Sequence, residues 1–260
     1  MIQEHFQELL KYRALIWALV QRHLAARYRG SFLGMLWSFL NPLCLMAVYT
    51  LVFQYYIRFT EVENYTIFLF CGLLPWIWVS SALVEGSISI STSGSLITKS
   101  MFPAHLLPVV FVLNTGVHFL LSLPLLFLFM LIGGEAIQWT VLFVPLLILL
   151  QFFFLHGLVL CLAALNVYFR DVQHLVGNVL TLLFFLCPIL YPTTIVPEAF
   201  KFSLIINPFA VFTVCYQKLI LDGLMPSALE WIMLFGWSSL SVYIGVATFY
   251  AYRESFAEVL

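Results

Sequence analysis

The stretch NYTIFLFCGLLPWIWVSSALV, residues 64–84, decides the fold class, because it holds no Asp, Glu, Lys or Arg. A transmembrane helix needs about 20 mostly apolar residues. The stretch is apolar throughout and does not alternate with polar residues, which disfavours the strand of a membrane barrel. Since the hydrocarbon offers no water to the backbone, an α-helix is the other way to pair its polar groups. Residues 64–84 therefore predict a membrane-spanning helix.

Five further stretches without charged residues pass the same length test on either side of it. They are residues 30–57, 100–134, 136–169, 172–197 and 231–252. Trimmed to plausible lengths, the spanning helices are predicted at about 33–57, 65–89, 105–132, 141–168, 172–190 and 229–251. The sequence thus predicts an all-α membrane protein whose domain of six transmembrane helices covers residues 31–252, with a cytoplasmic tail at 253–260.

Composition supports this assignment. Of the 260 residues, 63% are apolar and 9% are charged, whereas about 25% are charged in an ordinary soluble domain. These values exclude a soluble enzyme and a disordered chain, and a net charge of -1 gives no reason to expect a nucleic-acid partner. The five cysteines form no CxxC pair and the six histidines no i, i+4 pair, so we expect neither a disulfide framework nor a metal site.

The basic residues indicate the orientation. Eight of them lie on the side of the termini: Lys11, Arg13, Arg22, Arg27, Arg29, Lys99, Arg170 and Arg253. Only Arg58, Lys201 and Lys218 lie on the other side. Because cytoplasmic loops carry the excess of Lys and Arg, both termini are predicted to be cytoplasmic. The N-terminus lacks the short apolar core of a cleavable signal peptide.

Residues 1–30 are too polar to span and predict an amphipathic helix in the cytoplasmic headgroup layer. The apolar side chains on one arc of this helix are Phe6, Leu9, Leu10, Ile16, Trp17, Val20 and Leu24, and Trp17 is the expected interfacial anchor. In one interpretation the arginines only anchor the topology by meeting lipid phosphates. In the other, Arg22, Arg27 and Arg29, with Tyr28 between them, receive an anionic lipid-linked substrate through charge-assisted hydrogen bonds.

The segment STSGSLITKSMFP, residues 91–103, lies between the second and third predicted spans. It predicts a short helix from about Gly94 to Ser100, capped by Ser91 or Ser93. Such a helix would project from the membrane where a separate cytoplasmic motor can push it; a plain cytoplasmic loop is the alternative.

Glu85 is the acidic residue that stands inside a predicted span. A carboxylate there costs on the order of 2.5–3.5 kcal/mol, so it should face other helices or a watery cavity. Its structural interpretation is a hydrogen bond to a neighbouring helix, with Arg170 or a serine as partner.

Residues 187–226 precede the last span and hold five prolines, Pro188, Pro192, Pro197, Pro208 and Pro226. Pro197 is expected at the first turn of one short helix, and Asn207-Pro208 supplies the cap and first-turn proline of a second. In the second, Phe209, Phe212, Tyr216, Leu219 and Ile220 recur at helical spacing. The segment predicts two short helices that enter and leave the outer leaflet, either as a gate over a conduit or as a plug that only packs against the spans.

Motifs for catalysis are absent from the sequence. It contains no GxxxxGK[ST], HExxH or GxSxG. We therefore predict no catalytic residue and no ATP hydrolysis by this chain.

The run ARYRGSFLGMLWSFLNPL, residues 26–43, resembles the start of the first span in ABC-2 type permeases that export O-antigen, teichoic acid and capsular polysaccharides. Later stretches are similar to further signatures of that family in the same order: GLLPW at 72–76 with Glu85, SLITKSMFPAHLLPV at 95–109, LNVYFRDVQHLV at 165–176 and CPILYP at 187–192. One departure is Thr98-Lys99-Ser100, where the family often has two adjacent basic residues.

The resemblance implies a homodimer in the bacterial inner membrane, joined to two cytoplasmic P-loop ATPase subunits that bind the ATP and Mg, with no cofactor in this chain. Its substrate would be a polysaccharide on undecaprenyl diphosphate. The implied coupling helix comprises Ser93, Gly94, Ser95, Leu96, Ile97, Thr98, Lys99, Ser100, Met101 and Phe102. The implied gate comprises Tyr191, Pro192, Pro197, Asn207, Pro208, Phe209, Phe212 and Tyr216. The N-terminal helix would be the interface helix near the motor.

Three other functions stay open at this point: an ABC-2 exporter of a small amphiphile or drug, a membrane-embedded lipid or sugar transferase, and a passive channel. A P-loop ATPase in the adjacent reading frame would favour the exporters.

Overall fold

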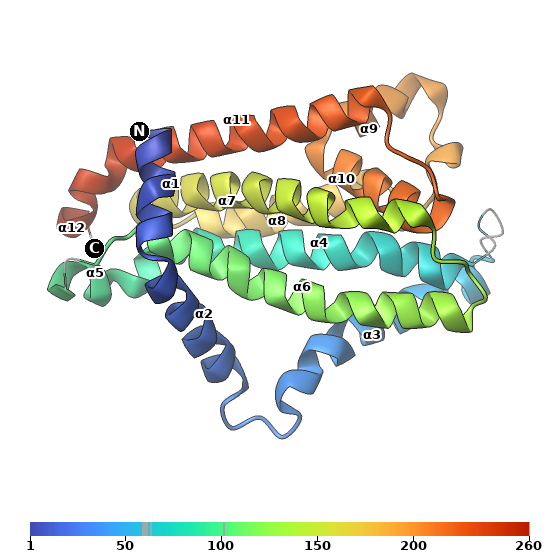
Figure 1. Cartoon of the computed structure of the whole chain (residues 1–260), viewed down its shortest axis with the longest axis horizontal. Helices are drawn as coiled ribbons and strands as arrows, with labels where there is room; N and C mark the ends of the chain where they lie inside the picture. The colour runs from blue at the N-terminus through green and yellow to red at the C-terminus, as the bar shows by residue number, and fades with distance from the viewer. Residues whose placement is uncertain (59–61, 63, 101, 260) are drawn as a thin grey trace.

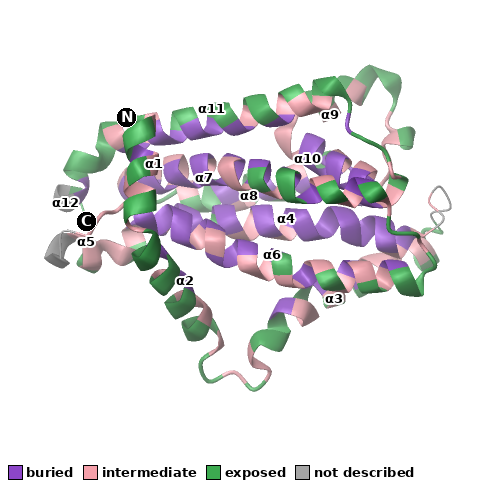
Figure 2. Cartoon of the chain, in the orientation of Figure 1, coloured by how far each residue is buried: buried purple, intermediate pink, exposed green. Residues whose placement is uncertain are grey.

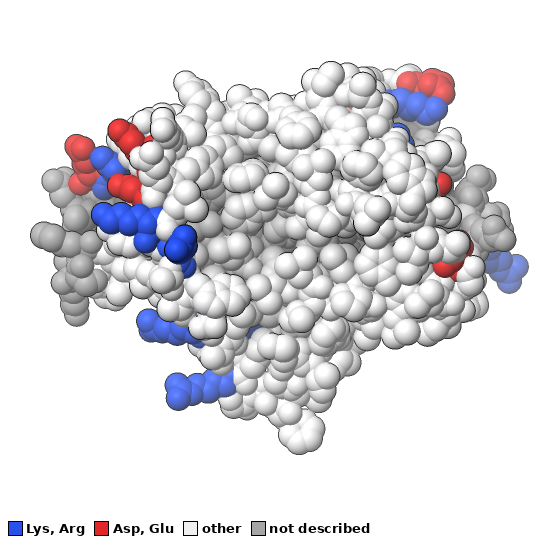
Figure 3. All heavy atoms as spheres, in the orientation of Figure 1, with Lys and Arg blue, Asp and Glu red and all other residues white. Residues whose placement is uncertain are grey.

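In the residues that the computed structural model describes (1–58, 62, 64–100 and 102–259), five helices are long and apolar enough to cross a membrane. They are Gly34–Tyr56, which contains α3 (Trp37–Thr50), α4 (Tyr65–Ser87), α6 (Leu106–Ile132), Trp139–Tyr168, which contains α7 (Val144–Tyr168), and Ala228–Ser255, which contains α11 (Ala228–Tyr252). Helices α4, α6, α7 and α11 run side by side, with both termini at one end (Figure 1). Charged side chains gather at the two ends of these helices and leave an uncharged band between them (Figure 3). The predicted all-helical, multi-pass fold is confirmed.

The fifth predicted span, 172–190, is shorter than expected. Its helix, α8, covers Val172–Leu186 and has 15 residues, or about 22 Å at 1.5 Å per residue, against about 30 Å for the hydrocarbon core. Pro188 explains where it stops, because a proline disfavours the helical conformation of the residue before it. Cys187 accordingly takes ψ 142°.

The chain after α8 continues without helix from Cys187 to Leu190, and these residues are buried. Their backbone is paired by side chains from other elements. Gln217 Nε2 donates to the Pro188 carbonyl at 2.8 Å, and the Tyr65 hydroxyl donates to the Leu190 carbonyl at 2.9 Å. Such pairing inside protein is the condition under which irregular backbone is tolerated at membrane depth.

The predicted re-entrant pair is present. A turn at Glu198–Phe200 leads into α9 (Lys201–Ile206), and α10 (Pro208–Gln217) continues through a π-helical turn to Asp222. The two halves are bent by 98°. The Asn207 side chain accepts from the Phe209 backbone N–H at 3.1 Å and Pro208 opens α10, so the predicted cap is confirmed. If this bent pair counts as one crossing, the spans number up to six.

The N-terminal segment forms two helices instead of the single helix that was predicted. The chain breaks at Tyr12 between α1 (Ile2–Lys11) and α2 (Arg13–Tyr28). Helix α2 packs along α6 and buries Ile16 and Val20, whereas α1 crosses to α11 (Figure 1). Because the two helices meet different neighbours, Leu10 and Trp17 on the predicted arc stay 66% and 55% exposed.

Small residues set the closest approach between helices, at the α7–α11 contact. A Cβ atom on Gly157 would lie 2.2 Å from the Ser241 carbonyl carbon, and one on Gly245 would lie 2.1 Å from the Gly157 oxygen. The Ser241 hydroxyl donates to the Phe154 carbonyl at 2.6 Å across the same contact, and Ser238 donates to Leu150 at 2.9 Å. This is how membrane helices bring their backbones together without large side chains between them.

Helix α4 lies at the centre of the bundle and is buried along most of its length (Figure 2). Trp78 is its best-packed large side chain near the pocket described below. Its indole is stacked on Phe119 of α6 with ring centroids 5.0 Å apart, and its N–H donates to the Val112 carbonyl at 3.2 Å. Helices α4 and α6 are thereby fixed to each other.

Candidate functional site

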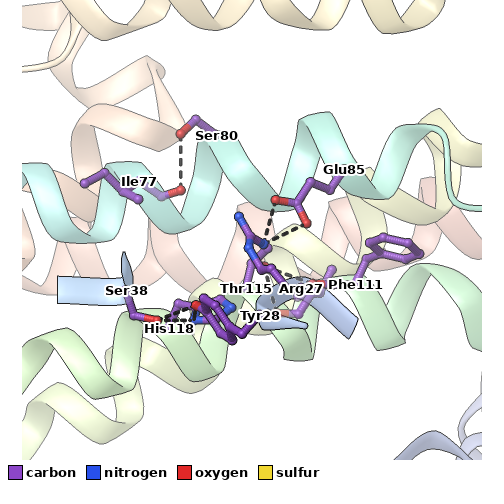
Figure 4. A network of polar contacts seen from close by, with 10 residues as sticks. Arg27, Tyr28, Ser38, Ile77, Ser80, Glu85, Phe111, Thr115 and His118 are labelled. Carbon is purple, nitrogen blue, oxygen red and sulfur yellow. Dashed lines mark hydrogen bonds and ion pairs between the residues drawn. The ribbon is translucent and has the colours of Figure 1, made fainter. Parts of the chain in front are cut away.

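Arg27 and Glu85, two residues singled out separately in the sequence, form an ion pair. Arg27 Nη1 lies 3.0 Å from Glu85 Oε1 and 3.2 Å from Oε2 (Figure 4). The partner of Glu85 is therefore Arg27 from the last turn of α2, and the expected partners, Arg170 or a serine, were wrong. Both side chains are partly exposed, 43% and 30%. In the part of the chain that the structure describes, the other guanidinium N–H donors have no protein partner.

Beside this ion pair, three uncharged side chains share hydrogen bonds. The Tyr28 hydroxyl lies 2.5 Å from Ser38 Oγ, and His118 Nδ1 lies 2.9 Å from Ser38 Oγ and 3.2 Å from Tyr28 Oη (Figure 4). This triad ties α2 to α3 and α6. The other ring nitrogen, His118 Nε2, is buried with no partner among the described residues.

A pocket of about 240 Å³ lies between α3, α4 and α6, with Arg27 and Tyr28 in its wall. Its polar lining is Ser38, Asn41, Ser81, Thr115, His118 and Ser122, and its aromatic lining includes Trp37, Trp78 and Phe119. On α4 the distance from Glu85 to Leu74, the deepest lining residue of that helix, is about 16 Å along the axis. We call this the entrance pocket; it leads from the charged end of the molecule into the uncharged band.

Of the four residues predicted to meet a lipid diphosphate, the structure brings Arg27 and Tyr28 to the entrance pocket. Arg22 and Arg29 are exposed, and neither has an ion pair in the residues described. Their proposed role is therefore not supported by any contact with the pocket.

The predicted gate residues on α10 point into the bundle. Phe209 packs on Trp76 of α4 and Phe154 of α7, with ring centroids 6.1 and 5.3 Å apart, and Phe212 also meets Phe154 at 5.4 Å. Tyr216 meets Phe119 at 6.0 Å. Because Phe119 also lines the entrance pocket, one ring separates that pocket from α10.

The remaining gate residues lie outside the bundle core. Tyr191 is half-buried and donates its hydroxyl to the Phe185 carbonyl at 2.9 Å. Pro192 is half-buried and Pro197 is exposed. These three residues frame the approach to α9 and α10.

The predicted coupling helix is α5, Gly94–Ser100, at the same end as both termini (Figure 1). Ile97 packs against a cluster that holds Val246 and Phe256, and Phe102 packs against the contact of α2 with α6. Ser95 is exposed, while Ser93, Gly94 and Leu96 are half-buried. Met101 and the side chains of Thr98, Lys99 and Ser100 lie outside the described residues. Helix α5 thus packs against the C-terminal end of the chain, and Phe102, just after it, packs near α2.

A histidine cluster fixes α1. His5 Nε2 lies 3.0 Å from His156 Nε2 of α7, and His105 Nε2 lies 3.4 Å from Glu8 Oε2. Burial, and to a smaller extent the nearby charge of His105, lower the pKa of His5 to about 4. A neutral His5 is therefore the form that docks.

Sequence reasoning missed Ser38, Asn41, Ser81 and His118 as residues of one site. Each is a polar residue inside a charge-free stretch, and polar residues in that position tend to face the bundle or a cavity. That signal was available, but only the packing of α3 against α4 and α6 shows that the four meet.

Comparison with known proteins finds similar proteins that all belong to one family. The family model described as "ABC-2 type transporter" matches residues 14–221. The chain is 41% identical over 254 residues to the O-antigen export system permease protein RfbA of Myxococcus xanthus, covering 97% of each chain. Two proteins of the same name from Klebsiella pneumoniae are 32% and 30% identical, each with 95% of both chains covered.

Proposed function

The chain belongs to the ABC-2 type transporter family, and from this membership we propose that it moves a polysaccharide linked to a lipid diphosphate outward across the bacterial inner membrane. It is the membrane-spanning permease subunit of an ATP-driven exporter, and not the enzyme that hydrolyses ATP. The names of its relatives specify O-antigen export and favour a glycan over a small amphiphile or drug. The observation that carries the proposal is Arg27 at the mouth of the entrance pocket.

Arg27 has the properties needed to hold the substrate's diphosphate. It lies in the last turn of α2, beside Glu85 near the end of α4. We place this end of the helices at the depth of the lipid headgroups, where the diphosphate would stand while the lipid tail of the substrate stays in the leaflet. Only Nη1 is used by Glu85, and a guanidinium has five N–H donors in a fork that matches phosphate oxygens. The same arginine can thus stay on Glu85 and bind a phosphate.

The proposed assembly is a homodimer with two cytoplasmic ATPase subunits. Helix α5 and both termini would meet the ATPases, which requires that this end be cytoplasmic, as the eight basic residues near it favour. The outward side of the span Gly34–Tyr56 supports a second copy, because Val48, Leu51 and Tyr55 there are 57%, 46% and 65% exposed. ATP-driven displacement of α5 would also move the end of α4, because α4 ends at Ser87 and α5 begins at Gly94.

The proposed route runs from the entrance pocket, past Phe119, to α10. Tyr216 and Phe212 fill the space beyond Phe119 in this structure, so α10 would have to move for a glycan to pass. This assigns the gate role to α9 and α10 and the reception role to Arg27.

Replacing Arg27 with glutamine tests the proposal, with Arg29→Gln as the matched control outside the pocket. Loss of one charge-assisted contact is worth about 1.5–3 kcal/mol, so Arg27→Gln should raise the substrate concentration for half-maximal ATPase stimulation by about 10- to 100-fold. Arg29→Gln should leave it near the wild-type value. ATPase activity is measured on the permease–ATPase complex in nanodiscs, and surface glycan in cells.

Two results would count against this role. If Arg27→Gln lowers complex yield or alters topology before stimulation changes, the arginine is an anchor only. If stimulation and export are normal, Arg27 is outside the mechanism. The double variant Arg27→Gln/Glu85→Gln separates loss of binding from the effect of an unpaired carboxylate.

A further inference from the structure

We propose that the entrance pocket is a carbohydrate subsite that binds the sugar unit attached directly to the lipid diphosphate. This inference rests on the proposed function, since Arg27 at the pocket mouth would hold the diphosphate itself. It adds a second ligand group, an uncharged sugar ring, and places it deeper in the uncharged band than the phosphates.

The size of the pocket suits a single ring. A cavity of about 150 Å³ is enough to hold benzene, and the entrance pocket measures about 240 Å³. It therefore has room for one six-membered ring with its substituents, and not for a folded length of glycan.

The charge of the pocket separates the two ligand groups. Arg27 is the cationic residue in its lining, and it stands at the mouth beside Glu85. Inward from it the lining is uncharged, and an anion transferred there without a partner would be strongly disfavoured. A diphosphate is thus kept at Arg27, while a neutral group bonded to it can enter.

Three polar groups in the lining lack a partner and point to an occupant that forms hydrogen bonds. Within the described residues, His118 Nε2 is buried without a hydrogen-bond partner. The side chains of Ser81, which is half-buried, and Asn41, which is exposed, also form no hydrogen bond there. Polar groups inside a membrane are costly unless paired. A lipid acyl chain cannot satisfy an amide, a hydroxyl and an imidazole nitrogen, whereas the hydroxyls of a sugar can donate to and accept from all three.

An aromatic surface completes the sugar-binding chemistry. Trp37 lines the pocket and is 50% exposed, so part of its indole is free to meet the apolar C–H face of a sugar. Trp78 is different, because it is 3% exposed and already stacked on Phe119. The site thus offers hydrogen-bonding groups and one accessible ring, which together recognise both surfaces of a pyranose.

The placement implies an order of events. The sugar next to the lipid would enter the band first, since it occupies the pocket while the diphosphate is still at Arg27. Its next neighbour along the route is Phe119, and beyond that Tyr216 of α10. The glycan would therefore be exported with its lipid-proximal end leading.

The test compares two synthetic ligands on the permease–ATPase complex in nanodiscs: a polyprenyl diphosphate, and the same lipid carrying one hexose or one N-acetylhexosamine. Binding is measured by native mass spectrometry and by ATPase stimulation. In the wild type at least one sugar should tighten binding. Asn41→Ala and Ser81→Ala should each weaken binding of the sugar-carrying lipid by about two- to ten-fold, the range for one hydrogen bond. Both variants should leave the affinity for the sugar-free lipid unchanged.

Matched controls are available on α8. Asn178 is exposed inside a predicted span and is not part of the pocket lining, so Asn178→Ala should change neither affinity. Arg27→Gln should weaken the binding of both ligands by the same factor. The subsite is overturned if neither sugar adds affinity to the wild type, or if Asn41→Ala and Ser81→Ala leave the gain intact; in either case a loss of both ligands in Arg27→Gln would still support the proposed function.

Discussion

Helix α4 and the span Gly34–Tyr56 have the same length, 23 residues, and similar mean hydropathy, 2.1 and 1.7, yet they meet opposite surroundings. In α4, 78% of the apolar window is buried inside the chain; in Gly34–Tyr56, 11% is. The difference shows that apolar content determines whether a helix enters the membrane and leaves open what the helix faces there.

The two spans are also held in different ways. Helix α4 is packed against α6, α7, α8 and α10, so side-chain packing fixes it along its length. The span containing α3 packs mainly against α4 and α6, and Tyr49 also stacks on Phe184 of α8. One end of this span is held by the triad of Tyr28, Ser38 and His118. We therefore expect α4 to depend on packing and α3 to depend on a few polar contacts.

The largest expected effect is a contrast between two tryptophans. Trp78→Ala in α4 should destabilise the protein by about 3–5 kcal/mol, because it leaves a cavity beside Phe119 and removes the hydrogen bond to Val112. Trp37→Ala, at the start of α3, should cost less than about 0.5 kcal/mol because that indole is half exposed. Thermal unfolding of both variants in the same nanodiscs measures the contrast, and equal losses would contradict it.

A smaller effect is expected when the hydrogen bonds that hold the start of α3 are removed. His118→Leu removes the hydrogen bonds to Ser38 and Tyr28, at about 1–2 kcal/mol together. Amide hydrogen exchange should therefore become about 5- to 30-fold faster in residues 31–50 and stay unchanged in α4. The matched control is His174→Leu on the exposed side of α8. Equal acceleration in α4 would show that His118 supports the whole bundle.

The smallest effect concerns α1, which polar contacts also hold. Docked His5 has a pKa of about 4, against about 6.5 when free, so undocked α1 binds more protons between these values. Docking is therefore complete above about pH 6.5 and weakens as the pH falls towards 4, by about 1 kcal/mol at pH 5.5. Hydrogen exchange of residues 2–11, corrected for intrinsic rates, should be faster at pH 5.5 than at pH 7.5.

His5→Phe is the control for that pH dependence. It keeps a ring against His156 and removes the titrating group, so most of the dependence should disappear. The other titratable groups around His5 are His156, His105, Glu8 and Tyr250. An unchanged pH slope in His5→Phe would assign the effect to His105 or His156 instead.

Much of the fold could be predicted because each signal is local. Charge-free length located four of the six spans to within about two residues and the last one to within about four, and Asn207-Pro208 located the bend between α9 and α10. Gly94–Ser100 was also found, from small polar residues bounded by Pro103. Helix α8 was predicted too long because the effect of Pro188 on Cys187 was given less weight than the continuous apolar run.

The site was less predictable because its contacts join distant segments. Arg27 and Glu85 were each recognised, one as an end-of-helix cation and the other as a costly acid, but 58 residues separate them. Nothing local indicates that α2 turns at Tyr12 and brings its last turn to α4. The same holds for His118, whose only signal was a polar ring in an apolar run.

The non-helical stretch from Cys187 to Leu190 has a consequence for how the outer end can open. Gln217 of α10 donates to the Pro188 carbonyl, so a shift of α10 would withdraw that donor from a peptide group buried inside the protein. An unpaired buried carbonyl costs about 1–3 kcal/mol, unless water reaches it. Opening of α10 and hydration of this stretch would therefore be a single event, and the conduit would fill with water as it forms.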